Sequence, residues 1–482
     1  MATITLNIDF DKVEGIDFQE LTANAYQMVL AFGRDLVRQV LEGMDDRLME
    51  ARDKSRYRNK GIQPTTIKTI MGEVSYSRRV YIDLAAAESA RCVHLLDDWM
   101  NVKKVGLVSE DICRIASRAV CENTYRGAAR LISECTGLHI SHQGVWNIIQ
   151  DLGQKQAGRI ERHTELMAKS QEVGVIETPI LYEEDDGIWI ALQGKSREKY
   201  GPSREMKVGI AYDGVRWIAC KGGKKRRVLN NKVAHAAFEP AKEYKKHKEA
   251  LVRSRFDTDS VQLRVLNGDG ANWIHSRLEP DTISVLDKYH RNKKITECVR
   301  DPGFADNIRK LLYAGETDLM LDCIEAQINS IEDPYEIDSL QELQRYFAGN
   351  KDSLLGYYDR GIGIPDTREP GVIHHARLGS MESNVFTLVG NRMKGRRACW
   401  SINGANHLAA LLCMYHTSGF ESMFDVVAPP VIEEKEPFTY RYSDVPHREG
   451  KGYEFWANSS LTHASPWFRG LAKSLRNGDV GF

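Results

Sequence analysis

A strand-rich block, residues 173–266, sets the architecture available to this chain. Its β-branched and alternating apolar residues predict five strands, at residues 180–192, 206–212, 216–221, 232–238 and 261–266. Asp213-Gly214 is a hairpin turn signal between the second and third of them. The charged segment 241–255 predicts a helix, and residues 283–286 predict a further strand. We therefore expect a multidomain α/β protein built on a mixed sheet.

Helical patterns dominate the chain before this block. Residues 18–52 carry apolar side chains at helical spacing, and residues 66–84 alternate in the manner of a small β-hairpin. Three shorter helices are predicted at residues 111–120, at residues 125–135 and after the capping residue Ser141. Short helices joined by a glycine-bearing turn match a helix-turn-helix unit, and an ordinary helical pack is the alternative.

After the block, the chain returns to helical patterns and then becomes polar and irregular. Helices are predicted in a charged region at residues 295–366 and at residues 384–393 and 405–415. The expected organisation is an N-terminal helix and small hairpin (1–95), a helical, helix-turn-helix-like region (96–165), a sheet core in two parts (166–290 and 375–420) with an all-helical insertion (291–374), and a C-terminal tail (421–482).

The composition excludes several classes of protein. Among 482 residues, no apolar run is long enough to cross a bilayer, and the N-terminus has neither region of a signal peptide. The nine cysteines are scattered without a CxxC pair, which argues against disulfide frameworks and zinc sites. A cytoplasmic protein is expected. Because the net charge is −1, any attraction to phosphates has to come from local basic clusters.

Three acidic residues stand in contexts that favour a catalytic site. Asp186 lies in the strand segment LYEEDDGIWI, Asp269 follows a strand in LNGDGA, and Glu382 opens a predicted helix. The alternative reading is structural, because Asp-Gly pairs favour turns and an acid in a first helical turn meets the helix dipole. Glu184 and Asp185 also compete with Asp186 for the first position.

The order of these elements resembles the ribonuclease-H-like fold. In that fold the first and fourth strands are neighbours, so Asp186 and Asp269 would meet at one end of the sheet. A later helix would then supply the third carboxylate. Carboxylate oxygens suit Mg²⁺, and two such ions about 3.5–4 Å apart activate the attacking oxygen and stabilise the leaving oxygen in phosphodiester chemistry.

Several sequence blocks also resemble a bacterial insertion-sequence transposase family. The blocks are EDDGIW from Glu184, GDGANWI from Gly268, LDKYH from Leu286, and the stretch from Glu382 through NRMKGRR to WS and GA. The family is typified by the Lre element of Gram-positive bacteria and is also filed as an uncharacterised protein family. The resemblance runs to about Tyr415. It implies a DDE transposase with a ribonuclease-H-like core, an all-helical insertion before the glutamate, and a metal-binding catalytic triad of Asp186, Asp269 and Glu382.

Two further features bear on this resemblance. Asp185 stands where members of that family often have a small residue, so the first ligand is ambiguous between Asp185 and Asp186. Asp287 and His290 resemble the Asp-x-x-His element of mutator-like transposases, which would put them near the scissile strand. A helix cap and a surface imidazole are the alternative reading of this pair. The tail beyond Tyr415 carries no motif that we can assign.

Candidate DNA contacts lie in two places. One set shares a face of the helix after Ser141, where amide groups can read base edges: Gln143, Asn147 and Gln150. The other set follows Glu382 and would hold phosphates, with a solvated surface as the alternative: Arg392, Lys394, Arg396 and Arg397.

The expected function is therefore a Mg²⁺- or Mn²⁺-dependent DNA transposase with two ions in each active site. It would bind the terminal inverted repeats of its element, cleave there and transfer the freed strand to target DNA. We expect it in the cytoplasm at the nucleoid, as a homodimer or higher oligomer on DNA, with no membrane partner. The alternatives are a DNA-binding regulator that has lost catalysis and a structure-specific nuclease on the same fold.

Overall fold

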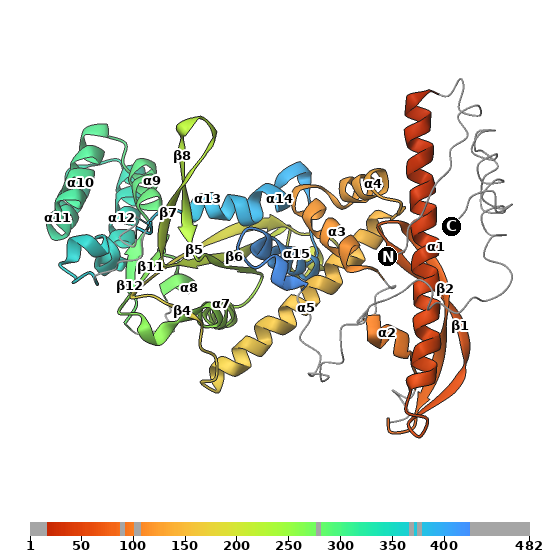
Figure 1. Ribbon diagram of the computed structural model, residues 1–482. Helices are drawn as coiled ribbons and strands as arrows, with labels where there is room; N and C mark the ends of the chain where they lie inside the picture. The colour runs from red at the N-terminus through yellow and green to blue at the C-terminus, as the bar shows by residue number, and fades with distance from the viewer. Residues whose placement is uncertain are drawn as a thin grey trace. The chain divides into compact units, whose positions relative to one another are not determined.

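The chain divides into two compact units. The computed structural model describes residues 17–86, 92–100, 108–275, 281–365, 371–373 and 378–424. The described part of the first unit is residues 17–148, and the second unit is residues 149–424 (Figure 1). The expected C-terminal tail, residues 421–482, lies almost entirely outside the described residues.

The first unit begins with a long helix packed on a β-hairpin. The helix α1 (Phe18–Ala51) contacts β2 (Gly72–Asp83), which pairs antiparallel with β1 (Tyr57–Thr69) and with the short β3 (Cys92–Val93). Their common core contains Leu41, Ile67, Val74, Tyr76 and, from α2 (Leu95–Met100), Leu96. The predicted helix and hairpin are confirmed, and the hairpin is longer than expected.

Three helices complete the described part of this unit. They are α3 (Glu110–Glu122), α4 (Tyr125–Cys135) and α5 (His142–Ala168), the last of which continues into the second unit. The hydroxyl oxygen of Thr124 accepts a hydrogen bond from the Gly127 N–H at the start of α4. Ser141 caps α5 in the same way through the Gly144 N–H, at 3.1 Å. The three predicted helices are confirmed.

The second unit is organised around a five-stranded mixed sheet in the order β12-β11-β5-β6-β9. The strands are β5 (Ile180–Ala191), β6 (Ser203–Tyr212), β9 (Val233–Ala237), β11 (Leu263–Gly268) and β12 (Ile283–Leu286). The pairs β5–β6 and β6–β9 are antiparallel, whereas β5–β11 and β11–β12 are parallel. A parallel neighbour requires a crossover connection, and α7 (Ala241–Arg255) provides it between β9 and β11. The expectation of a mixed α/β protein is confirmed.

One turn prediction is wrong. Asp213-Gly214 does not close a hairpin, because β6 has no pairing with β7 (Gly214–Ala219). Instead β7 pairs with β8 (Lys225–Asn230), which the sequence patterns did not predict, and the two form a separate antiparallel ribbon. The Asp213 carboxylate accepts hydrogen bonds of 2.8 Å from the side-chain amides of Asn230 and Asn231. These hydrogen bonds join the two ends of the ribbon at its base. The chain therefore leaves the sheet at Asp213.

Helices cover both faces of the sheet. Figure 1 shows α7 below the strands and α13 (Met381–Val385) above them. A π-helical segment (Phe386–Gly390) and α14 (Asn391–Met393) extend α13, and α15 (Ile402–Tyr415) contacts β9. A short helix, α6 (Gly194–Tyr200), joins β5 to β6. None of the described helices is both long and apolar enough to span a membrane.

A group of four helices follows β12. They are α9 (Lys288–Cys298), α10 (Pro302–Ala314), α11 (Thr317–Ser330) and α12 (Pro334–Gly349). Asp301 and Asp333 cap α10 and α12, each followed by a proline at the first helical position. Buried apolar side chains join the helices into one core, with Ile308, Leu312, Ile324, Leu343 and Phe347 among them. The predicted helical region is confirmed up to Gly349.

Candidate functional site

Three aspartates line up across the parallel half of the sheet. Strand pairing sets Asp185 opposite Gly268, and Gly268 opposite Leu286. One residue further along, each of the three strands has an aspartate next in the sequence: Asp186, Asp269 and Asp287. The Asp287 N–H also donates to the Gly268 carbonyl at 2.8 Å, which holds the ends of β11 and β12 together. The fold thus gathers three carboxylates from segments far apart in the sequence.

The neighbours Asp185 and Asp186 lie on opposite faces of β5, because side chains alternate along a strand. Asp185 faces α7 and is buried, with its Oδ1 2.6 Å from Lys248 Nζ. Lys248 also lies 2.7 Å from Glu183, the other acid on that face. Asp185 is therefore engaged in a buried ion pair. Of the two neighbours, Asp186 is the one that interacts electrostatically with Asp269 and Asp287.

Asp186 sits in an environment that disfavours its charge. Burial raises its pKa to about 6, and repulsion from Asp269 and Asp287 adds to this effect. A 2.7 Å hydrogen bond from the Gly187 N–H and attraction to His290 act in the opposite direction. A half-buried carboxyl surrounded by other carboxyls gains most from a cation. These oxygen donors fit Mg²⁺ or Mn²⁺ by their chemistry.

Asp287 and His290 form a coupled pair at the start of α9. Asp287 caps the helix, and its Oδ1 accepts hydrogen bonds from the Tyr289 and His290 N–H groups at 2.9 and 3.1 Å. The His290 Nδ1 lies 3.3 Å from the same oxygen, and this interaction raises the pKa of His290. Burial opposes ionisation of Asp287, but hydrogen bonds from His290 and Asn267 lower its pKa. The helix-cap reading is confirmed, and the imidazole is also part of the acidic cluster.

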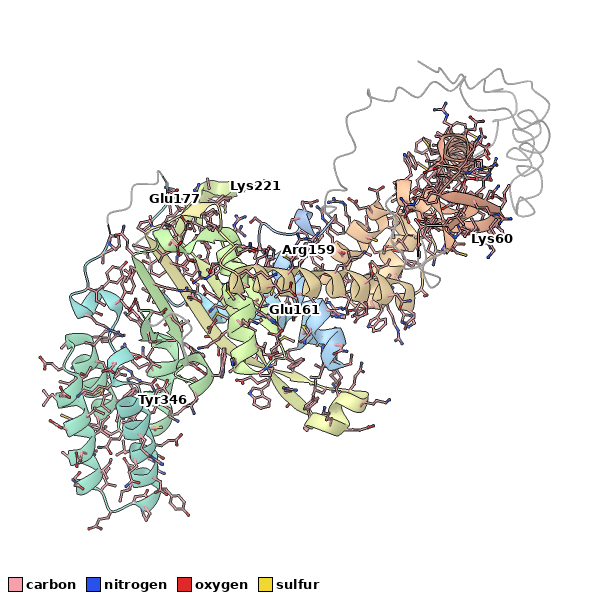
Figure 2. The ribbon with its side chains drawn as sticks, turned by 90° about the horizontal axis from the view of Figure 1, so that it is seen from below. Lys60, Arg159, Glu161, Glu177, Lys221 and Tyr346 are labelled. Carbon is pink, nitrogen blue, oxygen red and sulfur yellow. The ribbon has the colours of Figure 1, made fainter. Side chains whose placement is uncertain are left out.

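Asp269 is held by a tight turn. Its Oδ1 accepts a 2.9 Å hydrogen bond from the Ala271 N–H, and its carbonyl oxygen accepts a 2.7 Å bond from the hydroxyl of Tyr346 on α12. Figure 2 labels Tyr346, which links the helical group to the sheet. Gly270 has a positive φ of 89°, and a Cβ there would lie 3.0 Å from Asn350. The Asp-Gly turn predicted from the sequence therefore also orients the carboxylate.

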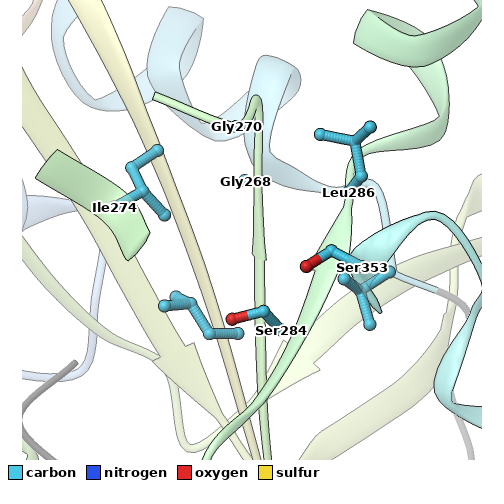
Figure 3. A pocket seen from close by; sticks show the side chains of 8 residues that line it. Gly268, Gly270, Ile274, Ser284, Leu286 and Ser353 are labelled. Carbon is cyan, nitrogen blue, oxygen red and sulfur yellow. The ribbon is translucent and has the colours of Figure 1, made fainter. Parts of the chain in front are cut away.

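A small cavity lies beside this turn but is not the site. Its lining, shown in Figure 3, includes Gly268, Gly270, Ile274, Ser284 and Leu286. The lining is mainly apolar and the space is far too small for a nucleotide.

Glu184 anchors the helix that carries Glu382. Glu184 is fully buried on the same face of β5 as Asp186, and burial raises its pKa. Its carboxylate accepts hydrogen bonds from the N–H groups of Gly379 and Ser380, both at 3.0 Å. Tyr212 and Asn267 donate to the same carboxylate, at 2.7 and 2.9 Å.

These bonds place the start of α13 on the Asp186 face of the sheet. Glu382 lies in the first turn of α13 and is exposed. The structure thus brings Asp186, Asp269 and Asp287 together and attaches the Glu382 helix beside them. From the sequence alone, Glu184 is only a rival of Asp186 for the first ligand position. No local signal could have revealed its anchoring role, because its partners Gly379 and Ser380 lie far away in the sequence.

The proposed base-reading residues separate into two groups. Gln143 and Asn147 are exposed on α5, and the Gln143 side-chain amide donates to Asn147 at 3.0 Å. Gln150 does not share that exposed surface. Its Oε1 lies 2.8 Å from Nδ1 of His407 on α15, within the second unit. Gln150 shares the helical face of Gln143 and Asn147, as the i, i+4, i+7 spacing predicts, but at its position that face packs against His407 of α15.

The basic residues after Glu382 also differ from one another. Arg392 lies over the ring of Trp400, with its guanidinium carbon 5.3 Å from the ring centroid. Lys394 and Arg397 are exposed. The side chain of Arg396 lies outside the described residues. Lys394 and Arg397 are thus the described members of this set best suited to contact phosphates.

A second group of potential metal ligands lies near the first turns of α7. His235, Glu239 and His247 have ligand atoms within 4.8 Å of one another. The two oxygens of Glu239 lie 3.1 Å from His235 Nε2 and 3.0 Å from His247 Nδ1. Burial opposes ionisation of Glu239, yet these hydrogen bonds lower its pKa to about 2. The hydrogen bonds explain why these three side chains lie together, so we interpret the cluster as a structural link between β9 and α7.

The comparisons with known proteins agree on one family. Residues 12–422 match the uncharacterised protein family UPF0236. A curated relative from Streptococcus gallolyticus, a UPF0236 protein in the vanSb 3′ region, is 22% identical over 413 residues, which cover 83% of this chain and 84% of the relative. The matched region includes the three aspartates and the Glu382 helix. Because the match spans most of its length, the chain belongs to the UPF0236 family.

Proposed function

We propose that this chain is a metal-dependent DNA transposase that cleaves and joins phosphodiester bonds. The observation that carries the proposal is the alignment of Asp186, Asp269 and Asp287 at neighbouring positions of three parallel strands. Three carboxylates at one point repel one another unless a cation or a proton intervenes. The raised pKa of Asp186 expresses that repulsion and the burial of the group.

The sheet supports a ribonuclease-H-like core. Three antiparallel strands in sequence (β5, β6 and β9) are followed by a crossover helix and by two strands parallel to the first. This order brings the first strand beside the fourth, as that fold requires. The helical group between β12 and α13 corresponds to the insertion that the family resemblance implies. Fold alone does not carry function, so the proposal depends on the carboxylates.

In this proposal Asp186, Asp269 and Glu382 hold two Mg²⁺ or Mn²⁺ ions. Bound there, the ions would activate the attacking oxygen and neutralise charge on the phosphate and leaving oxygen. Asp186 is repelled by Asp269 and Asp287, so a cation held there would offset that repulsion. Glu184 orients the helix of Glu382 through the backbone of Gly379 and Ser380.

Asp287 and His290 have a supporting role in the same site. Asp287 fixes the start of α9 and keeps the imidazole of His290 beside the cluster. A protonated His290 offers a positive charge near Asp186 and can donate a hydrogen bond to a phosphate oxygen. DNA-end recognition is assigned to Gln143 and Asn147, and phosphate contacts to Lys394 and Arg397. The proposed protein acts in the cytoplasm, as a homodimer or higher oligomer on DNA.

A cleavage and strand-transfer assay tests the proposal. Labelled duplexes carrying the inverted repeats that flank the gene are incubated with the full chain, supercoiled target plasmid and Mg²⁺ or Mn²⁺. We expect cleaved ends and joined products with wild type, and neither product with Asp186→Asn or Asp269→Asn. Glu325→Gln is the matched control, since it removes an exposed carboxylate on α11.

The outcomes separate the alternatives. Cleavage without joining would identify a structure-specific nuclease on the same fold. Sequence-specific binding to the repeats with no cleavage under any metal condition would identify a regulator. Wild-type activity in both aspartate variants would remove this cluster as the active site.

A further inference from the structure

The β7–β8 ribbon is exposed along most of its length. Its register sets Trp217 opposite Arg227 and Ile218 opposite Arg226. All residues from 216 to 226 are exposed on both faces of the ribbon. Figure 1 shows the ribbon extending away from the strands of the sheet, and Figure 2 labels Lys221, which lies in its turn. An isolated two-stranded ribbon is at best marginally stable in water. The ribbon beyond its base therefore contributes nothing to the core.

The ribbon carries charge of one sign only. Between Gly214 and Asn230 there are six basic residues and no acidic residue. The basic residues are Arg216, Lys221, Lys224, Lys225, Arg226 and Arg227. In a chain with a net charge of −1, the ribbon is a local patch of positive charge, which favours a polyanionic partner. Trp217 and Ile218 are 53% and 48% exposed among these cations.

The base of the ribbon is fastened beside the Glu382 helix. Arg227 Nη1 donates to the hydroxyl oxygen of Ser380 at 3.1 Å. Ser380 is also the residue whose N–H binds Glu184. Two backbone hydrogen bonds of 3.0 and 2.9 Å join Val215 to Ile373. The ribbon therefore starts at a fixed point next to the acidic cluster while its far end remains exposed.

We infer that the β7–β8 ribbon enters a groove of the duplex DNA whose phosphodiester bond lies at the acidic cluster. The major groove of B-DNA, about 12 Å wide, admits a two-stranded β-ribbon. The lysine and arginine side chains contact phosphates on both sides of the groove, and Trp217 faces the bases and sugars, while Ile218 points to the other face of the ribbon. This inference rests on the proposed function for the position of the DNA, but the binding itself requires neither metal nor catalysis.

The test compares two lysine pairs of equal charge in the full chain. Lys224→Gln with Lys225→Gln alters the ribbon, and Lys242→Gln with Lys246→Gln alters exposed positions on α7, which packs on the opposite face of the sheet from α13. Binding of a fluorescent 30-base-pair random duplex is measured in EDTA at several salt concentrations. Each lost phosphate contact lowers the log–log salt slope by about 0.9. We expect the ribbon pair to reduce the slope by about 2 units and the α7 pair to leave it unchanged.

A further variant and a second nucleic acid probe the groove itself. Trp217→Ser should weaken duplex binding several-fold with little change in slope, because it removes an apolar contact and no charge. Duplex RNA of the same length has a deep, narrow major groove, so the ribbon lysines should affect its binding much less. Equal slopes for the two lysine pairs would overturn the inference. If the ribbon lysine pair lost as much affinity for duplex RNA, or for polyglutamate used as a competitor, as for duplex DNA, the ribbon would be a nonspecific charged surface. That result would also overturn the inference.

These results are independent of catalysis. If strand cleavage fails but the ribbon pair changes the salt slope, the groove contact stands and the proposed chemistry falls. If cleavage requires Asp186 but the slope is unchanged by the ribbon pair, the chemistry stands and DNA enters by another path.

Discussion

Asp186→Asn should stabilise the metal-free protein at neutral and alkaline pH. The folded state holds the Asp186 pKa at about 6, above its usual value of 3.8. A carboxyl whose pKa is raised in the folded state does not lower the free energy of unfolding below its unfolded pKa. The destabilisation grows as pH rises from the unfolded pKa and levels off above the folded pKa. The penalty therefore develops between about pH 4 and pH 6 and is complete above pH 6. Asparagine keeps an oxygen for the Gly187 N–H and carries no charge.

The shift sets the size of the effect. A rise of about 2 pKa units corresponds to about 3 kcal/mol, since each unit is worth about 1.36 kcal/mol. Asp186 is only half-buried, so solvent screening reduces this to about 1–3 kcal/mol. A gain of 1 kcal/mol raises the Tm of a domain of this size by about 2–4 °C. We expect a gain of several degrees at pH 8 and almost none at pH 4.

Calorimetry in EDTA at pH 4, 6 and 8 measures this difference, with Glu325→Gln as the exposed control. Adding Mg²⁺ at pH 8 should then raise the Tm of wild type but not that of Asp186→Asn, because a ligand stabilises only the form that binds it. A Tm loss in Asp186→Asn that is the same at every pH would refute the reasoning. It would mean that the carboxylate makes a structural contact and carries no charge penalty.

Three other predictions follow from the same geometry. Asp185→Asn should destabilise the second unit by about 1–3 kcal/mol, because Lys248 then keeps only Glu183. The loss is smaller than for a fully ionised buried pair, because burial raises the pKa of Asp185. Chemical unfolding measures this, and an unchanged midpoint would contradict it. Glu382→Gln should abolish cleavage in Mg²⁺ while leaving duplex affinity in EDTA within about twofold, and normal cleavage would remove this residue from the triad. Gln143→Ala with Asn147→Ala should reduce the preference of the full chain for the repeat ends over random DNA by about 1–3 kcal/mol for each lost bidentate contact. Equal losses on both DNAs in competition binding would assign the pair to packing.

Much of the secondary structure could be predicted from local sequence. The apolar spacing of α1 and the charged pattern of α7 identify helices without tertiary information, because helical periodicity involves neighbouring residues. The strands β5, β11 and β12 were likewise predicted from their residue types. The Asp-Gly turn after β11 was visible for the same reason.

Long-range pairing decided which acids meet. The sequence shows that Asp185 and Asp186 point to opposite faces of β5, but it does not show which face α7 covers. Lys248 on α7 settles this by binding Asp185, and the register of β11 and β12 brings Asp269 and Asp287 to Asp186. The short turn signal at residues 213–214 misled the prediction because distant amides bind its carboxylate.

The difference between the two kinds of information is physical. Periodicity, capping and turn chemistry depend on residues within a few positions of one another, so the amino-acid sequence is sufficient for them. Strand register, the burial of Glu184 and the return of Gly379 and Ser380 to its carboxylate depend on contacts across nearly 200 positions. Those contacts exist only once the sheet and its helices have packed, and they bring the Glu382 helix to the face of the sheet that bears Asp186.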